Sequence, residues 1–120
     1  MAELLVEGDE LVLHMTTLEK AEGFHGDIRV PLSSVRAVRT EPSAWHGAVL
    51  RGLRAPGTGM PKVVAVGTRR GDFGKDFAAV HGTGPAVVVD MAGAEYHRFV
   101  VTADDAGAVA ARLRSAAGIT

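Results

Sequence analysis

The sequence has no cysteine, few aromatic residues and no long apolar run. Without cysteine there is no disulfide, no thiolate metal ligand and no cysteine nucleophile. Aromatic residues make up 5% of the chain, so Val, Leu and Ala must fill the core. No apolar stretch approaches the roughly 20 residues that a membrane-spanning helix needs. The acidic first ten residues are unlike a secretory signal, and we expect a cytoplasmic protein.

The 120 residues are 47% hydrophobic and 22% charged, which is ordinary for one folded domain over 1–120. Fifteen glycines indicate many tight turns, which suit short strands better than a helical bundle. The preference for Ala, Gly, Val, Arg and Asp is typical of a high-GC bacterial coding bias.

Apolar alternation and turn residues predict a succession of short strands. The first two are joined by Gly8-Asp9, where a hairpin turn requires positive φ at the glycine. Pro31 ends the third strand. Residues 16–26 are predicted to be a loop with a short helical turn, and residues 69–75 a turn. The predicted strands cover 4–7, 10–13, 27–30, 35–40, 63–66, 77–80, 86–91 and 96–101. For 35–40 the spacing of Val35 and Val38 leaves a helical turn as the alternative.

The C-terminus changes to helical periodicity. Apolar residues recur on one face from Ala106 to Ala117. Thr102 is the expected N-cap and Gly118 the expected stop, which predicts a helix over about 103–117. Consecutive strands followed by one helix predict an α+β, mostly β fold: a bent antiparallel sheet or split barrel of about seven strands, capped by the C-terminal helix.

This order of elements resembles the pleckstrin-homology-like (PH-like) fold of small bacterial proteins. The resemblance is carried by Leu11 to Leu13, by the segment from Ile28 to Val38 with its Pro31-Leu32, and by the closing strand and helix from Phe99 to Leu113. It implies a non-catalytic scaffold for binding lipids, peptides or proteins. Lipid-binding members carry basic residues in the first hairpin turn, whereas here that turn, from Glu7 to Glu10, is acidic.

Charge is distributed unevenly along the chain. Residues 1–28 hold seven acids and one base, for −6; residues 29–75 hold nine bases and two acids, for +7; residues 76–120 hold five acids and three bases, for −2. The basic block is either an anion-binding face or a set of cations that pair with the acidic N-terminal strands across the sheet.

Two candidate surfaces lie inside the basic block. Arg69, Arg70 and Lys75 flank a glycine-rich turn, which predicts a weak anion site or simply an ordinary hairpin. A phosphate-binding P-loop does not fit, because Asp76 stands where that motif needs Ser or Thr.

The second candidate is the irregular segment 41–61. Trp45, with Arg51, Arg54 and Met60, has the composition of a protein-binding hot spot. The alternative is an apolar cluster that packs this long segment onto the sheet.

The sequence contains no motif typical of catalysis or of metal binding. The five histidines form neither an i,i+4 pair nor an H-E-x-x-H, and no G-x-S-x-G occurs. We expect no catalytic residues, no metal and no cofactor. The favoured hypothesis is a protein-interaction or scaffold domain, and the alternatives are an anionic-ligand or membrane-surface binder and a small-molecule enzyme. Nucleic acid is not an expected partner, since the pI is near 6.5; a homodimer stays open.

Overall fold

The computed structural model describes residues 2–23, 26–47, 49–54, 58–60 and 63–119, with backbone alone at 22–23, 53–54 and 58–59. Ten strands, two α-helices and one 3-10 turn lie in these ranges. In chain order they are β1 (Glu3–Glu7), β2 (Glu10–His14), α1 (Thr17–Gly23), β3 (Ile28–Pro31), η1 (Leu32–Ser34), β4 (Val35–Glu41), β5 (Leu53–Arg54), β6 (Thr58–Met60), β7 (Val64–Gly71), β8 (Gly74–His81), β9 (Ala86–Met91), β10 (Arg98–Thr102) and α2 (Ala106–Ala117).

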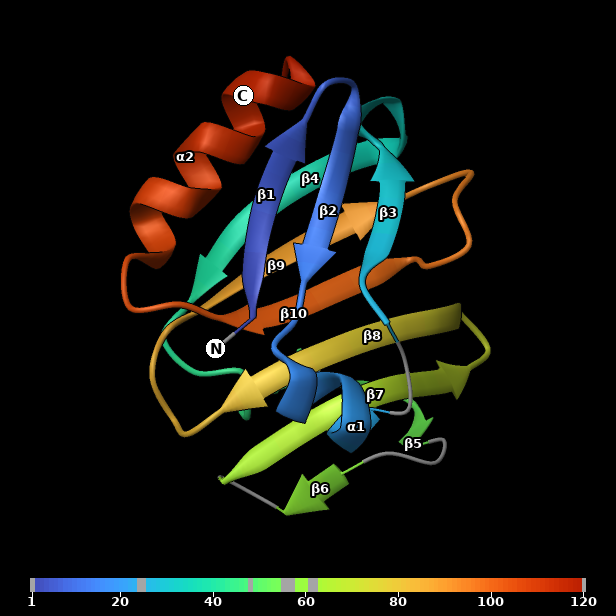
Figure 1. The fold of residues 1–120 in the computed structure, drawn as a ribbon, viewed down its shortest axis with the longest axis vertical. Coiled ribbons are helices and arrows are strands. Elements are labelled where there is room, and N and C mark those ends of the chain that lie inside the picture. The colour runs from blue at the N-terminus through green and yellow to red at the C-terminus, as the bar shows by residue number, and fades with distance from the viewer. Residues whose placement is uncertain (1, 24–25, 48, 55–57, 61–62, 120) are drawn as a thin grey trace.

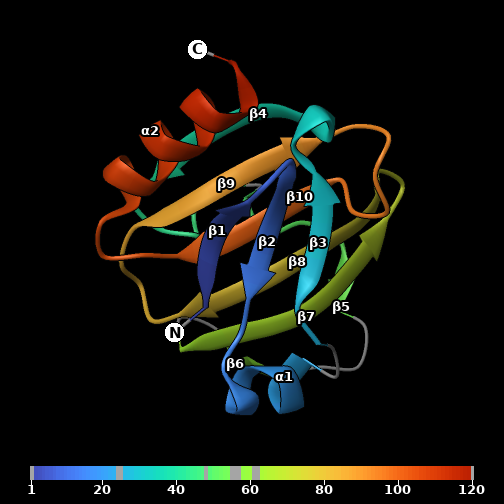
Figure 2. The same ribbon diagram turned by 45° about the horizontal axis from the view of Figure 1, so that its top comes forward.

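The strands form two sheets, which confirms a mostly β fold with one C-terminal helix. Sheet A has the order β1-β2-β3, and sheet B has the order β4-β9-β10-β8-β7-β5, with β6 also paired to β7. Sheet A lies across the face of sheet B, and α2 runs along one side of both (Figure 1). The second view shows β1, β2 and β3 in front of the longer strands of sheet B, with α1 below them (Figure 2). Within the described residues the two sheets do not join into a closed barrel.

The first hairpin forms as predicted. Gly8 has φ +62°, a conformation that glycine adopts at no steric cost. Glu7 and Glu10 face each other across the turn, and the register continues to the pair of Glu3 and His14. Alternation along β2 sends Leu11 and Leu13 into the space between the sheets.

Sheet B differs from the predicted antiparallel sheet in one strand pair, because β10 runs parallel to β8. The remaining pairs are antiparallel. β9 does not pair with β8. Instead β10 lies between these two strands and also pairs with β9, in antiparallel orientation. The predicted turn at 69–75 is also too wide. β7 continues to Gly71 and β8 starts at Gly74, so Arg69, Arg70 and Lys75 all lie in strands.

Both faces of sheet B are covered. The inner face packs Phe77, Phe99 and Val101 against sheet A and α2, with the Tyr96 ring 5.9 Å from the centre of each Phe ring. The outer face carries a second buried cluster, which includes Ala78 and is covered by part of the irregular segment. That cluster comprises Ala44, Val49, Ala65, Ala78, Val80, Ala86, Val88 and Val100, with Trp45 and Leu50 packed against it.

The C-terminal helix is shorter than predicted at its start. It begins at Ala106, because Thr102 is still paired with Ala86 in β10. Its end is as predicted: Gly118 adopts φ +69° and closes the last turn. The buried face of α2 packs on β4 and β9. None of the described helices combines the length and the apolar character needed to cross a membrane.

Candidate functional site

The three residues predicted to bind an anion do not gather into one site. Arg69 lies opposite Asp76, whereas Arg70 lies opposite Lys75, and neighbouring residues of a strand point to opposite faces. Arg69 donates to the backbone carbonyls of Arg51 (3.0 Å) and Gly52 (3.3 Å). The fold therefore uses Arg69 to hold the segment beside β7.

Lys75 is also engaged inside the chain. Its Nζ lies 2.6 Å from a carboxylate oxygen of Glu95 and 4.7 Å from the centre of the Tyr96 ring. Arg70 is exposed, and its side chain is the one member of the predicted set for which the described residues provide no bond. One exposed guanidinium is a weak basis for an anion site.

The residues predicted as a hot spot have different environments. Trp45 donates from Nε1 to the carbonyl of Gly82 at 2.9 Å and packs on the outer cluster of sheet B. Arg51 binds Asp76 through two hydrogen bonds of 2.7 and 3.1 Å and stacks on Phe73 at 4.0 Å. Met60, at the end of β6, is 57% exposed. Arg54 lies in β5, and its side chain falls outside the described residues.

The basic block finds its partners mainly within sheet B. Arg39 bonds to Glu41 and Asp90, in addition to the contacts of Arg51 and Lys75. The predicted pairing with the acidic N-terminal strands occurs for Arg29. Its guanidinium lies 3.0 Å from a carboxylate oxygen of Glu7 and 3.5 Å from one of Glu10. Arg39 and Arg51 pair with acids of sheet B, and Lys75 pairs with Glu95 of the segment between β9 and β10.

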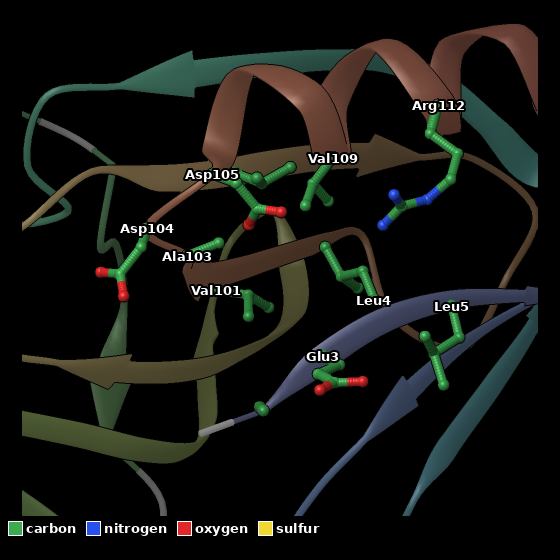
Figure 3. Close-up of a pocket in the computed structure, with 11 residues that line it drawn as sticks. Glu3, Leu4, Leu5, Val101, Ala103, Asp104, Asp105, Val109 and Arg112 are labelled. Carbon is green, nitrogen blue, oxygen red and sulfur yellow. The ribbon is translucent and has the colours of Figure 1, made fainter.

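A pocket of about 400 Å³ lies in a different place, between β1, the end of β10 and the start of α2 (Figure 3). Leu4, Val101 and Val109 extend into it from these three elements. Four charged residues complete its wall. The lining residues are Ala2, Glu3, Leu4, Leu5, Val87, Val101, Ala103, Asp104, Asp105, Val109 and Arg112.

The pocket exists because the chain changes direction there. β10 ends at Thr102, and three residues carry the chain across to α2, which starts at Ala106. These residues include Ala103, whose small side chain leaves space beside β1. Since the sheets do not close, none of the described strands fills the corner between β1 and sheet B.

β1 is an edge strand that pairs, among the described strands, with β2 alone. Alternate N–H and C=O groups of an edge strand point away from its partner. We call this side of β1 the free edge; Glu3, Leu4 and Leu5 of this strand line the pocket. A strand edge and an apolar hollow thus occur at the same place.

A buried carboxylate holds the start of β1. Glu19, 2% exposed, accepts from the backbone N–H of Ala2 at 2.8 Å and of Thr16 at 3.0 Å. Thr16 Oγ1 in turn accepts from the N–H of Glu19 at 3.2 Å, which makes a capping box at the start of α1. His81 Nδ1 lies 3.5 Å from Glu19. The short helix therefore fixes the position of the pocket wall at Ala2.

The charged residues of the pocket are uncompensated by their neighbours. Glu3, Asp104, Asp105 and Arg112 are exposed, and none of their side chains bonds to another described residue. Three carboxylates and one guanidinium among the lining residues give the pocket a charge of −2. Its electrostatic potential therefore favours cations.

Sequence reasoning missed this site. Glu3 counts in the sequence only as one of the acids of the N-terminal strands, and neither Asp104 nor Asp105 belongs to a predicted site. About 100 residues separate them in the chain, so no local pattern shows that they share a pocket. No three described His, Asp or Glu side chains gather in a way that could hold a metal.

No family model matches the chain, and no curated protein or solved structure shows significant similarity to it. Inferences about the site therefore rest on its own geometry.

Proposed function

We propose that the protein is a non-catalytic binding module that holds an extended segment of a partner protein along the free edge of β1. The observation that carries this proposal is the coincidence of that edge with the 400 Å³ pocket beside it. A peptide added to a sheet edge gains main-chain hydrogen bonds, and a pocket beside the edge selects its alternate side chains.

The lining suits binding better than covalent chemistry. Leu4, Val101 and Val109 supply apolar contact, and the polar lining side chains are three carboxylates and one guanidinium. Among the described residues, no serine, threonine, lysine or histidine lines the pocket, so those residues offer none of these nucleophiles or bases. The same residues give an extended peptide both an apolar seat and charged contacts.

The anion-binding alternative has less support. The cations of the β7–β8 hairpin are engaged by Asp76, by Glu95 and by backbone carbonyls. An anion would have to displace these bonds, whereas the pocket beside β1 is already open. The Trp45 segment is likewise occupied, since it covers the outer face of sheet B.

Selection from a displayed library of random peptides, followed by amide chemical-shift mapping, tests the proposal. The expected result is a set of peptides whose binding shifts the amides of β1 and of α2 around Val109. Ala103→Trp should fill the pocket and weaken binding by at least about tenfold. Ala111→Trp is the matched control, because Ala111 is exposed on α2 and lies outside the pocket lining.

Three results would overturn the proposal. One is a failure to select any peptide. Another is a set of shifts confined to the β7–β8 hairpin or to β6. The third is equal binding by the wild type and Ala103→Trp.

A further inference from the structure

Charged and apolar groups occupy different parts of the pocket wall. The apolar side chains of Leu4, Val101 and Val109 extend into the hollow (Figure 3). The Asp105 carboxylate lies on its α2 side and the Glu3 carboxylate on its β1 side. Asp104 stands further out, on the turn before α2. Arg112 reaches in from the other end, two helical turns beyond Asp105, or roughly 10 Å along α2.

Asp105 carries an unused hydrogen-bonding capacity. It is the N-cap residue of α2, yet its side chain makes no capping hydrogen bond. An N-cap Asp ordinarily accepts from the amides of the first helical turn. Here the carboxylate lies on the pocket side of the helix start (Figure 3), so it is available to a ligand.

We propose that the pocket takes a lysine or arginine side chain of the bound segment. The aliphatic stem lies against Leu4 and Val109, and the charged end lies beside the carboxylate of Asp105, with Glu3 and Asp104 adding negative charge to the pocket wall. This inference rests on the proposed function and names the chemistry of the partner: an extended segment with a basic residue at the position that faces the pocket.

Two properties of the site favour a basic side chain over other occupants. Lys and Arg combine a long apolar stem with a terminal charge, which matches a pocket lined by both apolar and acidic side chains. The net charge of −2 among the lining residues attracts a cation and disfavours an acidic side chain by like-charge repulsion. A purely apolar side chain would leave the three carboxylates without any new partner.

The room available is consistent with this occupant. A volume of about 400 Å³ lies at the lower end of the range that holds small ligands, about 300–1,000 Å³. This volume is large enough for one long side chain. Water can accompany the charged end, because the four charged lining residues are themselves exposed.

Three matched peptides test the inference. Each is acetylated and amidated, has the sequence Thr-Val-Thr-X-Thr-Val-Thr, and carries Lys, norleucine or Glu at X. Norleucine keeps the length and apolar character of the lysine stem without its charge. Fluorescence anisotropy should show the Lys peptide binding the wild type at least about tenfold more tightly than the norleucine peptide, with the Glu peptide weakest.

Pocket variants should move this preference in opposite directions. In Asp104→Asn combined with Asp105→Asn, the Lys preference should fall to about twofold or less, whereas Arg112→Gln should increase it. Added salt should reduce the preference, since charges near solvent are screened. The control is Asp9→Asn combined with Asp72→Asn, which removes the same charge from two exposed turn residues and should leave the preference unchanged.

The outcomes separate the two proposals. Equal binding of the Lys and norleucine peptides, with both abolished by Ala103→Trp, would overturn the basic-side-chain inference and leave the binding groove intact. A preference that the Asp9 and Asp72 control loses equally would also overturn it, because the effect would then come from net charge alone. Binding of no peptide, or binding unaffected by Ala103→Trp, would overturn both.

Discussion

The basic β7–β8 hairpin is conspicuous in the sequence, whereas the acidic pocket beside β1 is visible only in the structure. Most charges of the hairpin are paired within the protein, and those of the pocket are not. Around the hairpin, Arg51 is paired with Asp76 and Lys75 with Glu95. Around the pocket, the carboxylates of Asp104 and Asp105 bond to no described neighbour. A run of like charge along the chain therefore says little about which charges the folded protein offers to a partner.

The difference has a structural cause. The β7–β8 ladder places Arg69 opposite Asp76 but Arg70 opposite Lys75. Segments beside the hairpin supply the counter-charges: Arg51 binds Asp76, and Glu95 binds Lys75. The pocket residues come from the first strand and from the junction before the last helix. Nothing in the ladder supplies cations to that junction.

The largest expected effect concerns Asp76, whose side chain is 2% exposed. Asp76→Ala should lower the free energy of unfolding by about 3 kcal/mol, because it leaves the half-buried Arg51 guanidinium without its partner. Urea denaturation measures this loss, and Asp72→Ala, an exposed turn residue, is the control. A change as small as that of the control would show that the pair is not structural.

Glu19 should give the next largest effect. Glu19→Ala removes the capping box and the bond to Ala2, and we expect about 2 kcal/mol of lost stability. Binding at the pocket should weaken as well, since Ala2 is part of its wall. Thr17→Ala, at an exposed position of the same helix, should change neither. Unchanged stability in Glu19→Ala would refute the role of this carboxylate in holding β1.

Asp27 offers a smaller effect that depends on pH. The backbone N–H of Met15 donates to its carboxylate and, with His14 and Lys20 nearby, holds the pKa of Asp27 below its ordinary value. A lowered pKa adds stability above the pKa of the unfolded state, and this stability disappears as pH falls through the folded-state pKa. Near neutral pH, the free energy of unfolding of the wild type should exceed that of Asp27→Asn by about 1 kcal/mol. An advantage that persists at strongly acidic pH would contradict this assignment.

The smallest expected change in the free energy of unfolding concerns the two pocket residues Asp104 and Asp105. Asp104→Asn combined with Asp105→Asn should change the free energy of unfolding by less than about 0.5 kcal/mol, because no bond within the described residues is lost. The same urea experiment used for Asp76→Ala measures it. A loss as large as that of Asp76→Ala would mean that these carboxylates hold the fold together and are not available to a ligand.

Local patterns predicted much of the secondary structure. The hairpin at Gly8 and the helix end at Gly118 were predictable because both need a left-handed glycine. Thr102 was wrongly predicted as a helix cap, because its place is decided by pairing with Ala86 and by the N–H that His81 donates to its hydroxyl. The parallel pair of β8 and β10 was missed for a similar reason, since strand order depends on contacts between distant segments.

The candidate surfaces show the same limit. Trp45 stood out for its composition, and the structure packs it on sheet B, with its indole N–H bonded to Gly82. This packing is the alternative to a protein-binding hot spot that the composition of the segment left open. Arg69 and Arg70 are adjacent in the chain but lie opposite different residues of β8, so the predicted anion site divides between two faces.

The sequence by itself determined the alternating strands, the turns at glycine and the amphipathic helix, because these depend on residues within a few positions of one another. Only the tertiary structure decided which charges are paired, which edge of sheet A is free and where a pocket opens. Those features depend on how two sheets and one helix pack, and packing joins residues such as Glu3 and Asp105 that no local pattern relates.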